Sequence, residues 1–238
     1  MREGTLEGAT NAFATQALRR CALFAHLDDR TLDLVATSLR IRRYRRGEVI
    51  FHQGDPGDSL YVIEDGAVKI VLPSPDGEEA IIATLRRGDF FGELALLDGA
   101  PHSATAGALE PTTILALGRA RFHELVEGEP TLRDALLAGL AHELRRLTRH
   151  VEELHFLDLA GRLAMHLAGL AREAQPDART EVRLDWPYTQ SDLAAMIGGT
   201  RQSVNRLLAG LVEQGLVRID RDSIVIADVD RLARSAEH

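Results

Sequence analysis

The sequence has a single cysteine, Cys21, among its 238 residues. One cysteine cannot form an internal disulfide, and it cannot supply a cysteine-built zinc site or an iron–sulfur cluster. No run of about 20 apolar residues is present, so the sequence predicts no membrane-spanning helix. The first eight residues include Glu3 and Glu7 and lack an apolar core, unlike a secretory signal peptide. We therefore expect a cytoplasmic protein with no membrane partner.

Signatures of catalysis are missing as well. The sequence contains no Gly-x-Ser-x-Gly elbow, no phosphate-binding P-loop and no His-Glu-x-x-His zinc motif. The length has room for about two domains of ~150 residues, and the segments assigned below leave no room for a catalytic domain. We expect no enzyme activity and no metal site.

An excess of positive charge is also absent, because the net charge is −8 at pH 7. Residues 159–238 hold 10 basic and 11 acidic side chains, so even this part of the chain is not basic overall. Any contact with DNA must come from a local patch of basic side chains.

Residues 23–130 alternate glycine-containing turns with short apolar runs. Such turns recur at intervals of 9 to 11 residues, beginning with Arg46-Gly47, Pro56-Gly57, Asp65-Gly66 and Asp76-Gly77. This spacing predicts an antiparallel sandwich or barrel. The expected strands are 49–51, 60–63, 68–72, 80–83 and 113–117, with short helices before them. Residues 1–22 are expected to form a leader, with Cys21 outside the fold and inert.

Residues 131–158 are predicted to form a long dimerisation helix. Apolar residues recur there at alternating spacings of three and four, which is the pattern of a coiled-coil seam. An amphipathic helix packed on its own domain is the alternative, because the pattern covers fewer than the ~3–4 heptads that a coiled coil usually needs. We call these six residues the seam: Leu137, Leu140, Leu144, Leu147, Val151 and Leu154.

Residues 159–238 have the pattern of a winged helix-turn-helix. Thr189 and Asp192 are spaced as a capping box that opens a helix, Gly198-Gly199 forms a turn, and Thr200 can cap the next helix. In that second helix an apolar stripe begins at Val204, so the polar residues Arg201, Gln202, Asn205 and Arg206 point away from the core. The segments 216–219 and 224–226 are predicted to form a two-stranded wing around Asp220-Arg221-Asp222-Ser223.

Four motifs in this order resemble one family of bacterial regulators. They are Gly54-Asp55-x-Gly57-Asp58-x-Leu60-Tyr61-Val62-Ile63, then Gly88-Asp89-Phe90-Phe91-Gly92-Glu93-Leu94-Ala95-Leu96, then Phe156-Leu157-Asp158-x-x-Gly161-Arg162-Leu163, and finally the segment from Thr200 to Leu208. The family is that of the cyclic AMP receptor protein and FNR (CRP/FNR). The resemblance implies an α+β protein with an N-terminal β-roll of the cyclic-nucleotide-binding jelly-roll type, a dimerisation helix and a C-terminal winged helix-turn-helix.

The resemblance also implies a function and its partners. A homodimer would bind double-stranded DNA at a palindromic operator, regulate transcription through RNA polymerase, and respond to a small effector in the β-roll. An effector-independent regulator with a vestigial nucleotide pocket is one alternative. A module that senses a nucleotide without reading DNA is another.

The effector residues that the resemblance implies lie mainly around two loops. Glu93 would accept a hydrogen bond from a ribose hydroxyl, and backbone amides near Gly92, Ser103 and Ala104 would face a phosphate. Thr148, on the long helix, could reach the base. The full set is Gly92, Glu93, Leu94, His102, Ser103, Ala104 and Thr148.

His102 departs from the family pattern, which places an arginine against the cyclic phosphate. Losing a charge-assisted contact should cost about 1.5–3 kcal/mol. Three interpretations remain open: His102 is a weaker phosphate donor, it belongs to a pocket adapted to another effector, or it is a polar loop residue of an empty pocket. We expect this protein to bind cyclic AMP weakly or not at all, and no other cofactor is implied.

On the DNA side, the resemblance assigns base and phosphate contacts to Arg201 and Arg206. An arginine fork fits the O6 and N7 atoms of guanine in the major groove. Gln202 replaces a glutamate of the best-known members, so the operator should differ from the family's TGTGA-type half-site at one step. Secondary contacts are expected from Asn205, Thr189, Ser191 and Gln190, for which helix capping or a solvated face is the alternative. Thr200, which can cap the helix, is also included among the expected DNA-binding residues.

Overall fold

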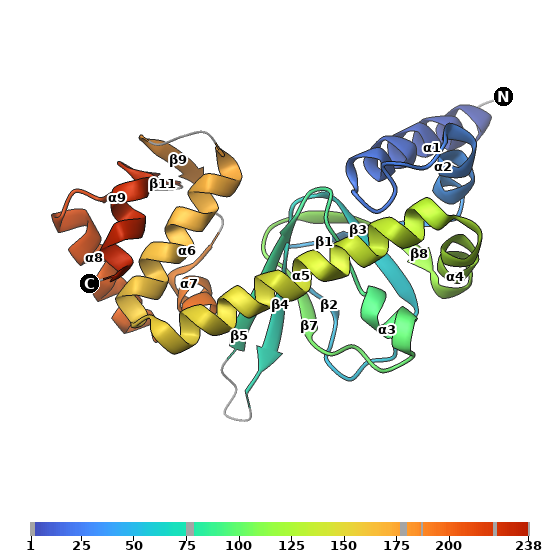
Figure 1. Cartoon of the computed structure of the whole chain (residues 1–238). Helices are drawn as coiled ribbons and strands as arrows, with labels where there is room; N and C mark the ends of the chain where they lie inside the picture. Colours follow the sequence, from blue (N-terminus) through green and yellow to red (C-terminus); the bar gives the residue numbers. More distant parts are fainter. Residues whose placement is uncertain (1–2, 75–78, 177–179, 187, 221–222, 238) are drawn as a thin grey trace. The chain divides into compact units, whose positions relative to one another are not determined.

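The computed structural model of the chain describes residues 3–74, 79–176, 180–186, 188–220 and 223–237, with side chains from residue 11 onward (Figure 1). The expected turn at Asp76-Gly77 and the centre of the expected wing turn, Arg221-Asp222, lie outside the described residues. The chain forms two compact units, Met1–Leu144 and Arg145–His238, which are treated separately below.

The first unit contains two four-stranded antiparallel sheets, as predicted for this part of the chain. One sheet has the order β1-β8-β3-β6, and the other has the order β2-β7-β4-β5. The first sheet comprises β1 (Leu39–Tyr44), β8 (Thr112–Gly118), β3 (Ser59–Asp65) and β6 (Phe90–Phe91); the second comprises β2 (Val49–Phe51), β7 (Thr105–Ala108), β4 (Ala67–Pro73) and β5 (Glu79–Arg86).

Strands β3 and β8 are buried on both faces, which explains their uninterrupted apolar sequences. Successive side chains of a strand point to opposite faces. Tyr61 and Ile63 belong to one core cluster with Phe91 and Ala106, whereas Leu60 and Val62 belong to a second cluster with helical residues. The sheet therefore packs against the other sheet on one side and against helices on the other.

Helices α1 (Glu3–Arg20) and α2 (Asp29–Ala36) lie side by side and pack on this outer face (Figure 1). Ala14, Ala17, Leu18 and Cys21 belong to this core, so the described part of the predicted leader is packed in the fold, and the prediction that Cys21 lies outside the fold is wrong. Cys21 is fully buried together with Leu18 and Phe24. Burial raises the pKa of its thiol to about 12, so the thiol is inert. The reason for its inertness is its place in the core and not a position outside the fold.

The long helix is α5 (Pro130–Phe156), preceded by α3 (Glu93–Asp98) and α4 (Arg119–Gly128). It carries two distinct apolar faces. Leu132 and Leu136 are buried in the outer-face cluster of the first unit. Seam residues Leu144 and Val151, by contrast, expose 66% and 63% of their surface in the single chain. Packing of α5 on the first unit thus uses Leu132 and Leu136 together with one seam residue, Leu140, which is partly buried against the same cluster.

The second unit is a helix-turn-helix framed by a small sheet. Its elements are α6 (Leu159–Ala174), β9 (Val182–Asp185), α7 (Gln190–Ile197), α8 (Arg201–Glu213), β10 (Val217–Ile219), β11 (Ser223–Ile226), α9 (Val229–Arg234) and the 3-10 turn η1 (Ser235–Glu237). The predicted pair of wing strands is confirmed as the antiparallel pair β10-β11. The sequence analysis missed a third strand, β9, which pairs with β11 and completes the order β10-β11-β9. On β9 the side chains of Val182 and Leu184 are buried and those between and after them are exposed. With only four residues, the strand is too short for this alternation to be recognised in the sequence.

No helix in the described part of the chain is long and apolar enough to cross a bilayer.

Candidate effector pocket and nucleic-acid interface

The expected effector turn joins β6 to α3. Gly92 adopts a φ of 87°, and a Cβ on this residue would lie 2.9 Å from the carbonyl oxygen of Ser59 and 3.0 Å from the ring of Tyr61. Only glycine accepts both the left-handed backbone and this close approach. The Gly-Glu-Leu motif therefore fixes a tight turn directly before Glu93.

The loop from residue 54 to residue 58 connects this turn to the segment around His102. The Gly54 amide donates to the His102 carbonyl, and the His102 amide donates to the Asp55 carbonyl, each at 2.9 Å. A Cβ on Gly57 would lie 2.3 Å from the Cβ of Ala95 in α3 and 3.3 Å from Cε1 of His102. The fold thus brings α3 and the His102 segment together over Gly57.

The imidazole of His102 is part of an aromatic cluster. His102 is only 6% exposed, and its ring stacks on Phe51 at a centroid distance of 3.6 Å and an interplanar angle of 7°. Phe51 in turn packs on Tyr61 and Phe91. Burial lowers the pKa of His102, although Asp55 and Asp58 oppose the shift. The ring therefore favours its neutral form, which suits a pocket wall better than a phosphate contact.

Glu93 is partly buried at the start of α3. Burial raises the pKa of its carboxyl to about 7, and the negative charge of Glu143 on α5 adds to the shift. Near neutral pH this side chain is thus divided between its acid and its carboxylate. The acid form can donate a hydrogen bond, whereas the carboxylate can only accept one.

Arg119 is a residue of this region that sequence reasoning missed. Its guanidinium donates to the carbonyl of Gly57 at 2.5 Å and to that of Ala95 at 3.1 Å, and its amide donates to the Asp58 carbonyl at 2.8 Å. An arginine does reach the effector turn, but its donors are used to join the loop to α3. No local motif indicates this role, because Gly57 is 62 residues away.

The other expected effector residues differ in accessibility. Ser103 and Leu94 are exposed, and Ala104 is buried. Thr148 lies on α5 in the second unit, so its role toward the base stays a prediction.

Replacing Glu93 by glutamine should stabilise the protein at high pH. The raised pKa means that the folded state keeps a proton that the unfolded state releases above about pH 4.5, so the free energy of unfolding falls as pH rises toward 7. The cost is complete above pH 7 and is about 3 kcal/mol at most, because a pKa raised from 4.5 to about 7 corresponds to 1.36 kcal/mol for each pH unit between the two values. Urea unfolding should show Glu93→Gln matching the wild type near pH 4.5 and exceeding it at pH 8.

Glu173→Gln, an exposed change on α6, is the matched control and should leave the pH dependence unchanged. An equal stability difference for Glu93→Gln at both pH values would contradict the expectation.

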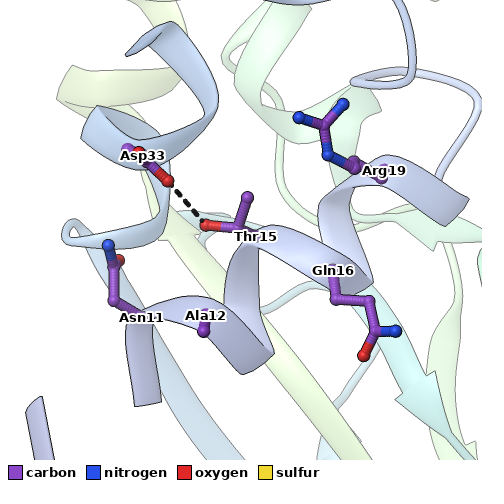
Figure 2. Close-up of a pocket in the computed structure, with 6 residues that line it drawn as sticks. All are labelled: Asn11, Ala12, Thr15, Gln16, Arg19 and Asp33. Carbon is purple, nitrogen blue, oxygen red and sulfur yellow. Dashed lines mark hydrogen bonds between the residues drawn. The ribbon is translucent and has the colours of Figure 1, made fainter. Parts of the chain in front are cut away.

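A separate surface pocket of about 410 Å³ lies between α1 and α2 (Figure 2). Thr15 donates to Asp33 across it at 3.0 Å, and Arg19 pairs with Asp29. The pocket contains none of the predicted effector residues. Its lining is Asn11, Ala12, Thr15, Gln16, Arg19 and Asp33.

The helix-turn-helix consists of α7, a glycine turn and α8. Thr189 and Asp192 form the predicted capping box, with the Thr189 amide donating to the Asp192 carboxylate at 2.8 Å and the Asp192 amide donating to Thr189 Oγ1 at 3.1 Å. Thr200 caps α8 by accepting from the Ser203 amide at 3.1 Å. Gly198 ends α7 with a φ of 69°, as a left-handed glycine cap does.

The apolar face of α8 is turned inward, with Val204 and Leu208 buried. The opposite face is exposed and consists of Arg201, Gln202, Asn205 and Arg206. Ser191 on α7 is exposed too, whereas the hydroxyls of Thr189 and Thr200 already serve as caps. The four exposed side chains of α8 have the chemistry that reads base edges and phosphates in a major groove.

Comparison with known proteins agrees with both units. A family model described as the cyclic nucleotide-binding domain matches residues 41–129, and one described as the Crp-like helix-turn-helix domain matches residues 161–235. A CRP-like cAMP-activated global transcriptional regulator of Mycobacterium tuberculosis is 31% identical over 93% of this chain and 99% of its own length. The cyclic AMP receptor protein of Thermus thermophilus is 32% identical over 90% of this chain and 96% of its own.

A solved structure of FixK2 from Bradyrhizobium japonicum superposes with a TM-score of 0.74 at 25% identity, covering 84% of this chain and 98% of that one. A cyclic nucleotide-binding domain followed by a Crp-like helix-turn-helix defines a DNA-binding transcriptional regulator. The chain belongs to the CRP/FNR family of these regulators.

Proposed function

We propose that the protein acts as a cytoplasmic homodimer that binds a palindromic operator and contacts RNA polymerase. The observation that carries the dimer is the exposed seam on α5, since Leu137, Leu144 and Val151 are each more than half exposed in the single chain. Apolar stripes of this kind are covered by a second helix in coiled coils. Two α8 helices would then enter successive major grooves, ~34–36 Å apart.

In this proposal the chain divides by role. Residues 23–130 form the effector domain, residues 131–158 the dimerisation helix and residues 159–238 the DNA-binding domain. An effector would bind one arrangement of the dimer more tightly than another and so increase the population of the arrangement that it prefers.

Selection of operators from random DNA tests the proposed function. Arg201 and Arg206 would bind guanines, and Gln202 pairs well with adenine. We expect a twofold-symmetric site, related to TGTGA-type half-sites but changed at one step, to bind at least 1,000-fold more tightly than a scrambled duplex. Recovery of the unchanged half-site would contradict the role of Gln202. Absence of any preferred sequence would contradict the proposed function itself.

The effector site is proposed to bind cyclic AMP weakly. His102 supports this, because its buried, neutral ring stacks on Phe51 where relatives place a charged arginine. Glu93 supplies no positive charge in either of its forms, so it cannot compensate a phosphate, and at pH 8 its carboxylate predominates. An effector of other chemistry, or regulation by protein abundance alone, fits these side chains better than cyclic AMP does.

Calorimetry on the wild type and on His102→Arg measures this effect. A restored guanidinium adds a charge-assisted phosphate contact of about 1.5–3 kcal/mol, so His102→Arg should bind cyclic AMP roughly tenfold to a hundredfold more tightly at pH 8. Sub-micromolar affinity of the wild type at pH 8 would overturn the proposal. His102→Gln, which restores no charge, is the matched control.

A further inference from the structure

Helix α5 contains one glycine, Gly139, and this glycine lies against strand β6. A Cβ on Gly139 would be 3.1 Å from Cζ of Phe90 and 3.5 Å from its Cε1. Carbon atoms in contact normally lie ~3.5–4.0 Å apart, so the ring rests on the helix where a side chain is missing. A glycine inside a helix costs about 1 kcal/mol relative to alanine. The close approach of Phe90 gives this glycine a structural reason.

Strand β6 has one aromatic residue on each face. Phe90 packs on the outer-face cluster, which includes Leu132 and Leu136 of α5. Phe91 points to the cluster between the sheets, where its ring lies 5.1 Å from Tyr61 and 5.9 Å from Phe51. Because Phe51 is stacked on His102, a short series of rings joins the pocket wall to β6.

The same strand runs directly into the effector turn. Gly92 and Glu93 follow Phe91 without an intervening residue, and Gly92 is held against Ser59 and Tyr61. Any displacement of this turn must therefore move Phe90 or be absorbed by the neighbouring rings. Packed interiors transmit such displacements because they contain few voids.

Gly139 is placed among seam residues on α5. Leu140 follows it, and Leu137 precedes it by two positions with 59% of its surface exposed. A change in how the Phe90 ring packs on Gly139 therefore moves the helix backbone next to Leu137 and Leu140, the first two seam residues.

We propose that Phe90 and Gly139 are a positioning pair that couples the effector turn to the dimer seam and so sets DNA affinity. The inference rests on the proposed homodimer. In this proposal the pair acts through the packing of β6 on α5 and not by binding effector or DNA. It acts by favouring one of two dimer arrangements. Coupling between distant sites is a free energy of this kind, because each site changes the relative stability of the two arrangements.

The test is a double-mutant cycle on the full chain, without added effector. Gly139→Ala forces the ring to shift and should change affinity for the selected operator at least fivefold, which is the low end of typical couplings between sites. Phe90→Leu removes the ring, so adding Gly139→Ala to it should change affinity less than twofold. Gly169→Ala is the matched control, since that helical glycine of α6 has nothing within 4 Å of its Cβ position.

The dimer dissociation constant, measured by sedimentation, should shift for Gly139→Ala and not for Gly169→Ala. The inference would be overturned if Gly139→Ala changed operator affinity by the same factor in the wild type and in Phe90→Leu. It would also be overturned if Gly139→Ala left operator affinity unchanged. If Gly139→Ala does not fold, Phe90→Leu decides alone, and an operator affinity within twofold of the wild type would overturn it. A wild type that selects no operator would instead overturn the proposed function, and this inference with it.

Discussion

Alanine at both Arg201 and Arg206 should abolish sequence-selective DNA binding and leave the fold and the dimer intact. Both side chains lie on the exposed face of α8, so their removal opens no cavity. A bidentate arginine–guanine contact provides about 1–3 kcal/mol of discrimination, and a dimer would present four such arginines. We expect operator affinity to fall about 1,000-fold or more, to the level of scrambled DNA, and the salt dependence of binding to weaken.

Fluorescence anisotropy with operator and scrambled duplexes at two salt concentrations measures both effects. Arg172→Ala is the matched control, because Arg172 is an exposed arginine of the same unit that pairs with Asp230 at 3.4 Å. Its operator affinity should stay within a factor of two of the wild type. A double variant that still separates operator from scrambled DNA would show that α8 does not read the sequence through these residues.

Glutamate at Leu144 and Val151 should convert the proposed homodimer to a monomer. Both side chains are exposed in the single chain and lie on the seam, so the fold itself does not require them to be apolar. Two copies would bring four carboxylates into a dehydrated interface, where unpaired charge is costly. Because each monomer then holds only one half-site, operator affinity should fall at least a hundredfold.

Analytical ultracentrifugation at micromolar concentration measures the change of mass. Arg149→Glu adds the same carboxylate to the same helix, at an exposed position on the side opposite the seam, and should leave the dimer intact. A double seam variant that sediments as the wild type does would place the dimer contact elsewhere.

The parts of the fold that could be predicted are those with strong local patterns. Strands β3 and β8 carry continuous apolar runs because each is buried on both faces. Strand β7 was not predicted, because its sequence Thr-Ala-Gly-Ala has no bulky β-branched run. Strand β6 has two residues, too few for any period, and is recognised only by its pairing with Tyr61 and Val62.

In the candidate sites, too, local contacts could be predicted and contacts between distant residues could not. The caps of Thr189 and Thr200 are local, three residues from their partners, and the sequence predicts them correctly. The stacking of His102 on Phe51 and the bonds from Arg119 to Gly57 and Ala95 join residues distant in sequence. Such contacts depend on how the strands pair, and a composition or spacing rule contains no information about them.

The burial of Cys21 has a practical consequence. A thiol whose pKa is raised to about 12 and which has no exposed surface presents almost no thiolate to a maleimide reagent. A second cysteine placed at an accessible position of α8 would then be the only reactive thiol in each subunit. Fluorophores attached there would report the separation of the two helices on DNA by energy transfer, with the native core left unaltered.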